Sequence, residues 1–518
     1  MSDILLIGWG LIGQWCLGAT VALAIAGPRL IATPARGFQR IIERAELLGL
    51  GCVLGIASTS YLQFLWSLAG GALGWGCSLT LAVGGPIAFV VVRWRCRTRL
   101  AGDARSAPGT LCFNAGAGGP LVRCCAALIG LIFISAMIQT LLTPQRLWDE
   151  RAYYGLKAIV LFEDHSVHSP DLADPDFVQG HPRYPLMISL AEQHIYALLG
   201  RVDDRWSKLL FPLMFAGLVL TFAGVQSRHR PASQAWLGAL LLATVPVLMP
   251  DDYGFLSGQA DAPVACLEGV ALLYLWDALA GDQSTKAVLN PCWSSLFLAA
   301  YVAGLAAFTK DEGIAYCGIN VLSFAGAWLA GRSIHASNRP AVAPVEFLPQ
   351  RHSSRAAIQA ILILVPIPGL VLAPWLWHRG HLPLTGEMNY FGRLRWETLI
   401  AGTETLGWSI PHLAWRMFGE ATVWGLHWWL MLVLLVMFPQ RALRPPQLFL
   451  LLNLTGALAA LLLAGMIAPV DFQEHIGGSS HRYLMQLAPA AVLFAVGQWQ
   501  PAAMSATLES PAKAERIG

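Results

Sequence analysis

Two adjacent carboxylates, Asp149 and Glu150, are the residues of this sequence best placed to do chemistry. They directly follow a long apolar run, residues 128–142, and begin the most polar part of the chain, residues 143–205. Charges at the end of a membrane helix are costly to place and often mark a functional site. A carboxylate in such a position can act as a general base or hold a metal ion. The alternative is an acidic helix end that is simply solvated at the membrane interface.

Other charged residues stand at the boundaries of apolar segments. Arg183 lies between two prolines that stiffen the chain, and its guanidinium could bind a phosphate at two points. Asp251 and Asp252 precede Asp261, which begins an apolar segment and would also be favourable there as a helix cap. Three carboxylates so close together in the sequence favour a functional role over capping alone.

Two more cationic motifs follow later in the chain. Lys310, Asp311 and Glu312 join two apolar segments with almost no loop, so their charges are held at the membrane boundary. Arg482 opens the last apolar segment and could bind an anion near the bilayer surface. For the turn at Lys310, the alternative is that its charges simply neutralise one another. For Arg482, the alternative is a side chain that anchors the helix by reaching toward lipid headgroups.

The composition determines which elements must position these residues. Of the 518 residues, 56% are hydrophobic and 13% are charged, whereas soluble domains carry about 25% charge. Apolar windows of about 20 residues recur, which predicts an all-α polytopic membrane protein of about 13 transmembrane helices rather than a β-barrel. The predicted spans are 4–26, 47–69, 71–92, 122–142, 206–225, 234–250, 259–280, 293–309, 313–330, 357–378, 421–438, 447–467 and 482–499.

Arginines in the short loops predict the orientation. Five arginine-containing loops fall on one side of this topology, which is therefore the cytoplasmic side. They are 27–46, 93–121, 226–233, 331–356 and 439–446. The acidic motifs then gather on the outer face. The predicted organisation is accessory helices in 1–93, a linker 94–121, a core 122–500 with an external loop 143–205, and a cytoplasmic tail 501–518.

The external loop is expected to contain two interfacial helices. In the first, from Asp149 to Phe162, helical spacing places Glu150, Tyr154 and Lys157 on one face and Asp149 on a neighbouring face. The second, residues 185–199, alternates apolar and polar residues and could lie flat on the membrane surface.

The sequence gives little support for nucleic-acid binding, for disulfide bonds or for a zinc site. The net charge of +3 gives no reason to expect nucleic-acid binding. None of the 10 cysteines falls in the long polar loops, so neither a disulfide framework nor a Cys/His zinc spacing is visible.

Four short segments, in chain order, resemble motifs of the polyprenyl-phosphate-sugar-dependent glycosyltransferases of the GT-C superfamily. The most similar group is family-39-like and includes protein O-mannosyltransferases and the lipid A aminoarabinose transferase. The matching segments are 149–154, 183–186, 308–313 and 481–484 with Pro489, and the resemblance spans residues 120–500. They correspond to an acidic motif of the first external loop, a cationic Lys-Pro-Pro-Leu segment, a lysine turn and a late Arg-Tyr segment.

The resemblance implies an enzyme that transfers a sugar from a polyprenyl-phosphate donor to a hydroxyl of a glycan, lipid or protein, with inversion. The site would face the outside of a bacterial inner membrane. We expect Asp149 to be the base, assisted by Glu150 or Asp261. The candidates for binding the donor phosphate are Lys157, Arg183, Lys310 and Arg482. The candidates for binding acceptor or sugar are Tyr153, Tyr154, Asp251, Asp252 and Glu312. Some relatives use a divalent metal ion, and the sequence does not decide this point.

Departures from the family pattern keep alternatives open. Arg183 replaces a lysine, and Asp311-Glu312 replaces a Gly-Pro pair of the aminoarabinose branch, so neither that contact nor that acceptor can be assumed.

The chain could instead be a transporter or flippase of a lipid-linked or anionic solute, which would carry charges through the bilayer depth. It could also be a ligase or polymerase of lipid-linked oligosaccharides, or a non-catalytic partner in envelope assembly.

Overall fold

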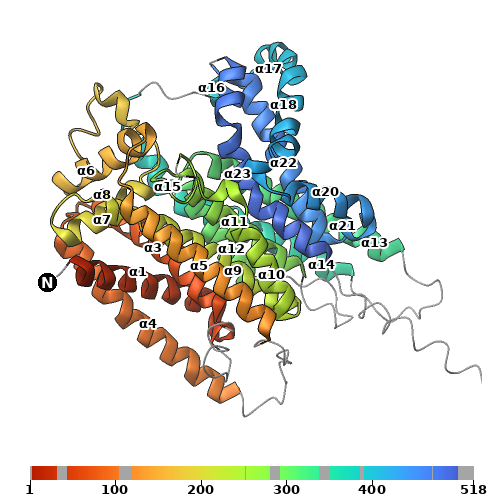
Figure 1. The fold of residues 1–518 in the computed structure, drawn as a ribbon, viewed down its shortest axis with the longest axis horizontal. Coiled ribbons are helices and arrows are strands. Elements are labelled where there is room, and N and C mark those ends of the chain that lie inside the picture. The colour runs from red at the N-terminus through yellow and green to blue at the C-terminus, as the bar shows by residue number, and fades with distance from the viewer. Residues whose placement is uncertain are drawn as a thin grey trace, which may run out of the picture.

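The structure, a computed structural model, describes residues 3–31, 44–103, 119–250, 252–280, 292–337, 350–384, 390–469 and 471–499. Every secondary-structure element in these ranges is a helix (Figure 1). The long helices are α1 (Asp3–Ala26), α3 (Ala45–Leu68), α4 (Trp75–Asp103), α5 (Pro120–Leu142), α9 (Leu210–His229), α11 (Asp261–Ala280), α13 (Glu312–Ser337), α14 (Gln350–Leu364), α15 (Pro366–Arg379), α22 (Pro445–Ile467) and α23 (Phe472–Gln498).

Further helices lie between these along the chain. They are η1 (Gly27–Leu30), η2 (Asp149–Gly155), α6 (Leu156–Glu163), η3 (Phe177–Gly180), α7 (Met187–Leu199), α8 (Asp204–Ser207), α10 (Ala232–Ala243), η4 (Pro246–Leu248), α12 (Trp293–Ala307), α16 (Tyr390–Arg393), α17 (Trp396–Gly402), η5 (Thr403–Thr405), α18 (Leu406–Gly419), α19 (Ala421–Trp424), α20 (His427–Met437) and α21 (Pro439–Ala442).

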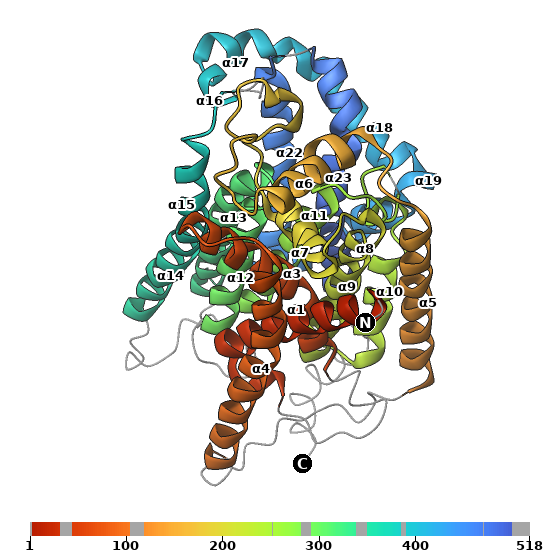
Figure 2. The same cartoon turned by 90° about the vertical axis from the view of Figure 1, so that its left-hand side faces the viewer.

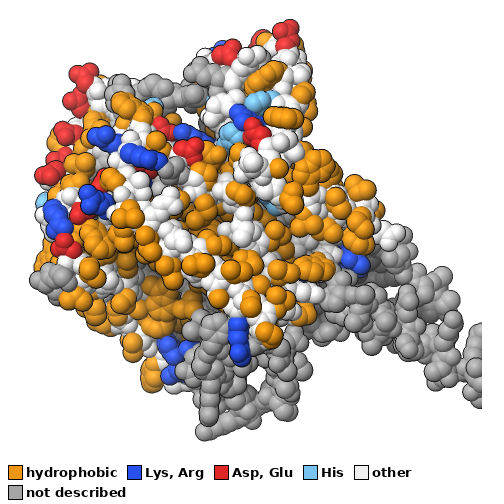
Figure 3. Space-filling model, viewed as in Figure 1, with side chains coloured by type: hydrophobic (Ala, Val, Ile, Leu, Met, Phe, Trp, Pro, Cys, Tyr) orange, Lys and Arg blue, Asp and Glu red, His pale blue; other side chains and the backbone are white. Residues whose placement is uncertain are grey.

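Nine helices in the described part of the chain are long and apolar enough to cross a membrane, as expected of a membrane protein. The other four predicted spans fall on the shorter apolar helices α10, α12 and α20 and on α23. A total of 13 spans therefore stays a prediction. The hydrophobic side chains cover the middle of the molecule, whereas the acidic side chains gather at one end, over α6 and α16–α18 (Figure 3).

Helix α11 lies at the centre of the bundle, and all of its residues are buried. It packs against α9, α12, α13, α22 and α23. At the periphery, α4 and α5 present many exposed apolar side chains, and Figure 2 shows both helices at the edge of the bundle. This distribution fits a bundle whose outer helices face lipid, because apolar surface is stable in contact with acyl chains.

The first three helices pack directly onto the rest of the bundle. A Cβ atom on Gly49 of α3 would lie 2.5 Å from the carbonyl oxygen of Gly217 on α9, so the two backbones touch. Small residues permit this close approach between membrane helices. The predicted boundary at residue 93 stays a prediction, but α3 belongs to the packed core. The linker residues 104–118 and the tail 501–518 lie outside the described residues.

The two helices predicted in the external loop are present, with one correction. Residues 149–163 form η2 and α6, and residues 187–199 form α7. The prediction that α7 lies on the membrane surface is wrong, because every residue from Met187 to Leu198, including Glu192, Gln193 and His194, is buried inside the protein. The polar side of α7 is turned into the protein, where the Nε2 of Gln63 donates to the Oε1 of Gln193 at 3.0 Å.

Candidate functional site

Asp149 pairs with the cation at the other end of the chain. Its Oδ2 lies 2.7 Å from Nη2 of Arg482, and both side chains remain partly exposed, at 21% and 33%. Asp149 begins η2, a widened helical turn in which the Leu156 N–H donates to the carbonyl of Arg151. Such turns are frequent at functional sites because they redirect side chains. The equal helical spacing assumed for residues 149–157 is therefore not observed.

A second ion pair joins the start of α11 to the turn between α12 and α13. The Nζ of Lys310 lies 2.7 Å from Oδ1 of Asp261 and 2.9 Å from Oε1 of Glu312. Burial by itself would lower the pKa of Lys310, but the two carboxylates outweigh it and hold this pKa well above its usual value. Lys310 is therefore a cation at neutral pH.

The two pairs belong to one site. Arg482 interacts electrostatically with Asp261 as well as with Asp149. Tyr483, the next residue of α23, places its ring 5.8 Å from the Nζ of Lys310. We call Asp149, Asp261, Lys310, Glu312 and Arg482 the charged cluster. Asp261 and Glu312 stand in the first turns of α11 and α13, so two helix N-termini, which favour anions, also meet here.

Glu150 lies beneath Asp149 and is held by several parts of the chain, and its predicted part in catalysis stays a prediction. Its side chain is fully buried. One oxygen accepts the backbone N–H groups of Arg146 and Leu147 at 2.8 and 3.2 Å. The other accepts the Gly258 N–H at 2.8 Å and lies 3.4 Å from Nζ of Lys208. Glu150 thus ties the start of η2 to the loop that enters α11, and so fixes Asp149 relative to Asp261.

Lys157 is buried beside the cluster rather than presented on a surface. Its Nζ donates to the carbonyl oxygens of His181 and Tyr184 at 3.1 and 3.5 Å. It also lies 5.6 Å from the ring centroids of Tyr154 and Tyr184. Lys157 therefore fastens the 181–184 segment to α6, and a phosphate would have to displace backbone acceptors to reach it.

The tyrosines predicted to bind acceptor or sugar differ in position. Tyr154 is 3% exposed, and its burial raises the pKa of its hydroxyl. Its electrostatic coupling to Lys310 and Asp261 places it next to the charged cluster. Tyr153 packs edge-on against His181, with ring centroids 4.5 Å apart.

The remaining predicted residues are not part of the charged cluster. Arg183 is half-buried, and Asp252 is exposed, with its backbone carbonyl accepting a hydrogen bond from Gln259. Asp251 lies outside the described residues.

A second polar group, which the sequence motifs did not predict, lies beside Arg482. Oε2 of Glu420 lies 2.9 Å from Nε2 of His481, and Glu420 also pairs with Arg416. Partial burial would raise the pKa of Glu420, but the hydrogen bonds from His481 and Arg416 hold it below its usual value. The ring of Tyr253 stacks on that of His481, with the two ring centroids 6.1 Å apart. The spacing of Arg416 and Glu420, one helical turn apart, was the only signal in the sequence.

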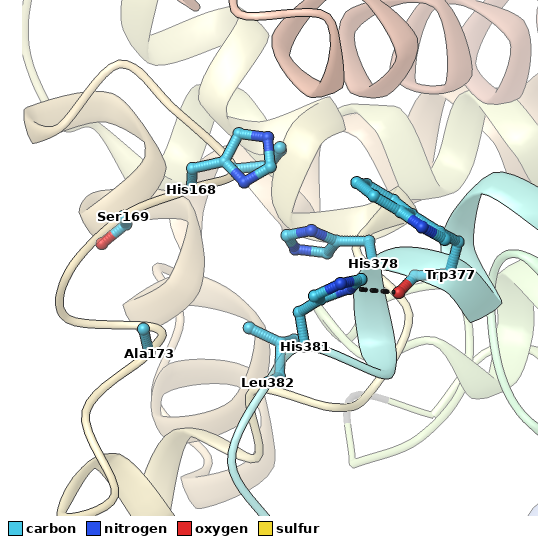
Figure 4. A pocket seen from close by; sticks show the side chains of 8 residues that line it. His168, Ser169, Ala173, Trp377, His378, His381 and Leu382 are labelled. Atoms are coloured by element: carbon cyan, nitrogen blue, oxygen red, sulfur yellow. Dashed lines mark hydrogen bonds between the residues drawn. The ribbon is translucent and has the colours of Figure 1, made fainter.

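A cavity of about 200 Å³ is lined by His168, His378, His381 and Trp377, and no residue of the charged cluster lines it (Figure 4). Arg379, next to His378, pairs at 2.9 Å with Asp311 of the lysine turn. Despite these histidines, no group of three or more His, Cys, Asp or Glu side chains among the described residues is arranged to hold a metal ion. The metal requirement stays untested.

Glu192 is a buried carboxyl group close to Glu150, and its protonation should affect the stability of the fold. It accepts a hydrogen bond from Gln145, and burial followed by the nearby Glu150 and Asp204 charges raises its pKa well above 4.5. A carboxyl group with a raised pKa in the folded state destabilises the fold as pH rises above its unfolded value. The free energy of unfolding should fall by up to about 1.4 kcal/mol per pH unit from this group.

Glu192→Gln, which mimics the neutral acid, should remove this part of the pH dependence. The measurement is unfolding in detergent between about pH 5 and about pH 8. The variant should gain stability over the wild type as pH rises. Parallel curves for the two proteins would show that Glu192 is not held neutral.

Comparisons with protein-family models, curated proteins and solved structures find no match to this chain.

Proposed function

We propose that this chain is a membrane glycosyltransferase that moves a sugar from a polyprenyl-phosphate donor to an acceptor hydroxyl, with inversion. The observation that carries the proposal is the meeting of Asp149–Arg482 and Asp261–Lys310 at one end of the helix bundle. A lipid-linked donor keeps its tail in the bilayer, so its phosphate must be bound at such a boundary. The site would face the outside of the cell.

The cations of the charged cluster would stabilise the phosphate as it leaves the sugar. Arg482 and Lys310 would contact its oxygens, and the N-termini of α11 and α13 would add to the positive potential. In the absence of substrate these cations are paired with carboxylates. A phosphate that competes for Arg482 would release Asp149 from its ion pair and leave it free to act as a base.

The reaction then requires one proton transfer and one displacement. Asp149 takes the proton of the acceptor hydroxyl, and the acceptor oxygen forms a bond to the anomeric carbon from the face opposite the phosphate. The bond from that carbon to the phosphate oxygen breaks, and its electron pair leaves with polyprenyl phosphate. A single base and a direct displacement give inversion. Glu150 contributes by positioning η2.

Replacing Arg482 with Gln tests the phosphate contact. Charge-assisted hydrogen bonds contribute about 1.5–3 kcal/mol, so KM for a polyprenyl-phosphate sugar should rise about 10- to 100-fold. The measurement is transfer kinetics in reconstituted membranes with radiolabelled donor. Arg201→Gln is the matched control, because Arg201 pairs with Asp3 on an exposed part of the protein. An unchanged KM for Arg482→Gln would return this arginine to a helix-anchoring role.

One observation favours the transporter alternative. Charges are not confined to the outer face, because α11 also buries Glu268 and Asp277. Movement of a lipid-linked or anionic solute across proteoliposomes, with no sugar transferred, would support that function. A ligase or polymerase would be recognised by the transfer of an oligosaccharide instead of a single sugar.

A further inference from the structure

Helix α11 carries a second carboxylate, Glu268, inside the bundle. It lies two helical turns after Asp261 on the same face, which places it about 10 Å deeper along the helix axis. Its side chain is 1% exposed, on a helix with every residue buried. An ionisable group at such a depth is expensive and usually has a function. The proposed transfer reaction does not use it.

Glu268 is only partly satisfied by its neighbours. Its Oε2 accepts a hydrogen bond from Nδ2 of Asn320 at 3.3 Å, and Oδ1 of Asn320 accepts one from Nδ2 of Asn453 at 2.7 Å. Its Oε1 is buried and has no hydrogen-bond partner within the described residues. An unsatisfied buried carboxylate oxygen is strongly unfavourable unless a proton or a water molecule reaches it.

Two polar side chains, Tyr316 and Gln486, stand on α13 and α23, which both pack against α11. The hydroxyl of Tyr316 donates to Oε1 of Gln486 at 2.7 Å, and Tyr316 interacts electrostatically with both Glu312 and Glu268. The Nε2 of Gln486 is a buried donor that also lacks a partner within the described part of the chain. Tyr316 follows Glu312 by one turn of α13, and Gln486 follows Arg482 by one turn of α23.

We propose that Glu268 is a proton-binding site in the membrane interior that exchanges its proton with the charged cluster through Tyr316, Gln486 and bridging water. Buried waters occur where polar groups would otherwise be unsatisfied, and the free donor of Gln486 and free acceptor of Glu268 are such groups. In each exchange a bridging water delivers a proton from the cluster side to the Tyr316 hydroxyl oxygen, and the proton that this oxygen carried passes through water to Glu268. The Glu268 carboxylate then becomes a neutral acid, and Tyr316 keeps its hydroxyl. The reverse step restores the carboxylate.

The surroundings favour a proton over a metal cation. The titratable groups that interact with Glu268 from α13 are Tyr316 and Cys317. The neighbouring helices α22 and α23 contribute the neutral amides of Asn453 and Gln486. A single carboxylate with amide neighbours offers too few anionic ligands for a divalent ion. This inference does not depend on the proposed sugar transfer.

Infrared difference spectroscopy of the full protein in lipid nanodiscs tests the proposal. On transfer from H2O to D2O, the wild type should show a carboxylic-acid carbonyl band that shifts with deuteration. Glu268→Gln should remove the Glu268 component of this band and leave the component of Glu192, whose pKa is raised and which Glu192→Gln identifies. Glu268→Asp should move the Glu268 component without removing it, which keeps the test open if the Gln variant does not fold. Retention of the whole band in Glu268→Gln would overturn the proposal.

The route is tested separately by the rate of the deuterium shift. Tyr316→Phe removes the hydroxyl and should slow the exchange about tenfold or more. Tyr301→Phe is the matched control, because Tyr301 bonds to Ser58 at 3.0 Å on another side of the bundle. Equal exchange rates in Tyr316→Phe and the wild type would show that the proton reaches Glu268 by another path.

Discussion

Replacing Asp149 with Asn should lower the rate of sugar transfer about 10²- to 10⁴-fold, which is the usual contribution of a positioned general base. Asparagine has nearly the same shape as aspartate and can still accept a hydrogen bond from Arg482, but it cannot take the proton of the acceptor hydroxyl. The fold should be preserved, since Asp149 is partly exposed and lies in η2, which Glu150 holds in place. The loss should appear in kcat, whereas donor KM should fall, because a neutral amide competes less with the donor phosphate for Arg482.

The measurement is single-turnover transfer from a radiolabelled polyprenyl-phosphate sugar to a matched acceptor. Asp203→Asn is the control, because Asp203 lies on the same side of the protein and pairs with Arg201 at 3.3 Å. The control should transfer sugar at the wild-type rate. If Asp149→Asn also does so, Asp149 is not the base, and Asp261 becomes the next candidate.

Replacing Lys310 with Met should reduce both stability and transfer. Asp261 is 1% exposed and would remain as a buried carboxylate without its closest cation. Breaking a buried ion pair by removing one partner costs about 3–5 kcal/mol. Transfer should be lost as well, because the leaving phosphate would lose one of its two proposed cations. Chemical unfolding in detergent and transfer kinetics measure the two effects.

A double variant separates the two effects of Lys310. Lys310→Met combined with Asp261→Asn removes the unpaired charge and should recover most of the lost stability, since neutral groups are less costly to bury. It should remain inactive in transfer. If the double variant regains activity along with stability, Lys310 serves only to neutralise Asp261. If the single variant is as stable as the wild type, the pair contributes nothing to the fold.

The organisation of α7 shows where sequence reasoning fails. Its alternation of apolar residues with Glu192, Gln193 and His194 correctly predicts a helix. The same pattern suggests a surface helix, because polar side chains usually face water. The structure buries this face, since α1, α3 and α4 pack against α7 and residues such as Gln63 and Gln145 supply hydrogen bonds. Those partners lie far away in the sequence, and no local pattern reveals them.

Glu150 illustrates the same limit within the site. Its place beside Asp149 suggested a shared catalytic role. Only the folded chain shows that the Gly258 N–H and Lys208 occupy its carboxylate. Buried carboxylates must be satisfied by hydrogen bonds or cations. Two of the groups that satisfy Glu150 come from distant segments, the residues between α8 and α9 and the loop before α11. Two adjacent carboxylates therefore have different surroundings.

The sequence by itself determined that this is a helical membrane protein with polar, charge-rich turns, because apolar segments long enough to span a bilayer have few other stable states. It also singled out Asp149, Asp261, Lys310 and Arg482 as separate charged motifs near helix ends. Only the tertiary structure decided that these four meet, because ion pairing between distant segments depends on how the helices pack. The same packing placed Glu268 inside the bundle, two turns below Asp261, and left one of its oxygens without a partner in the part of the chain that is described.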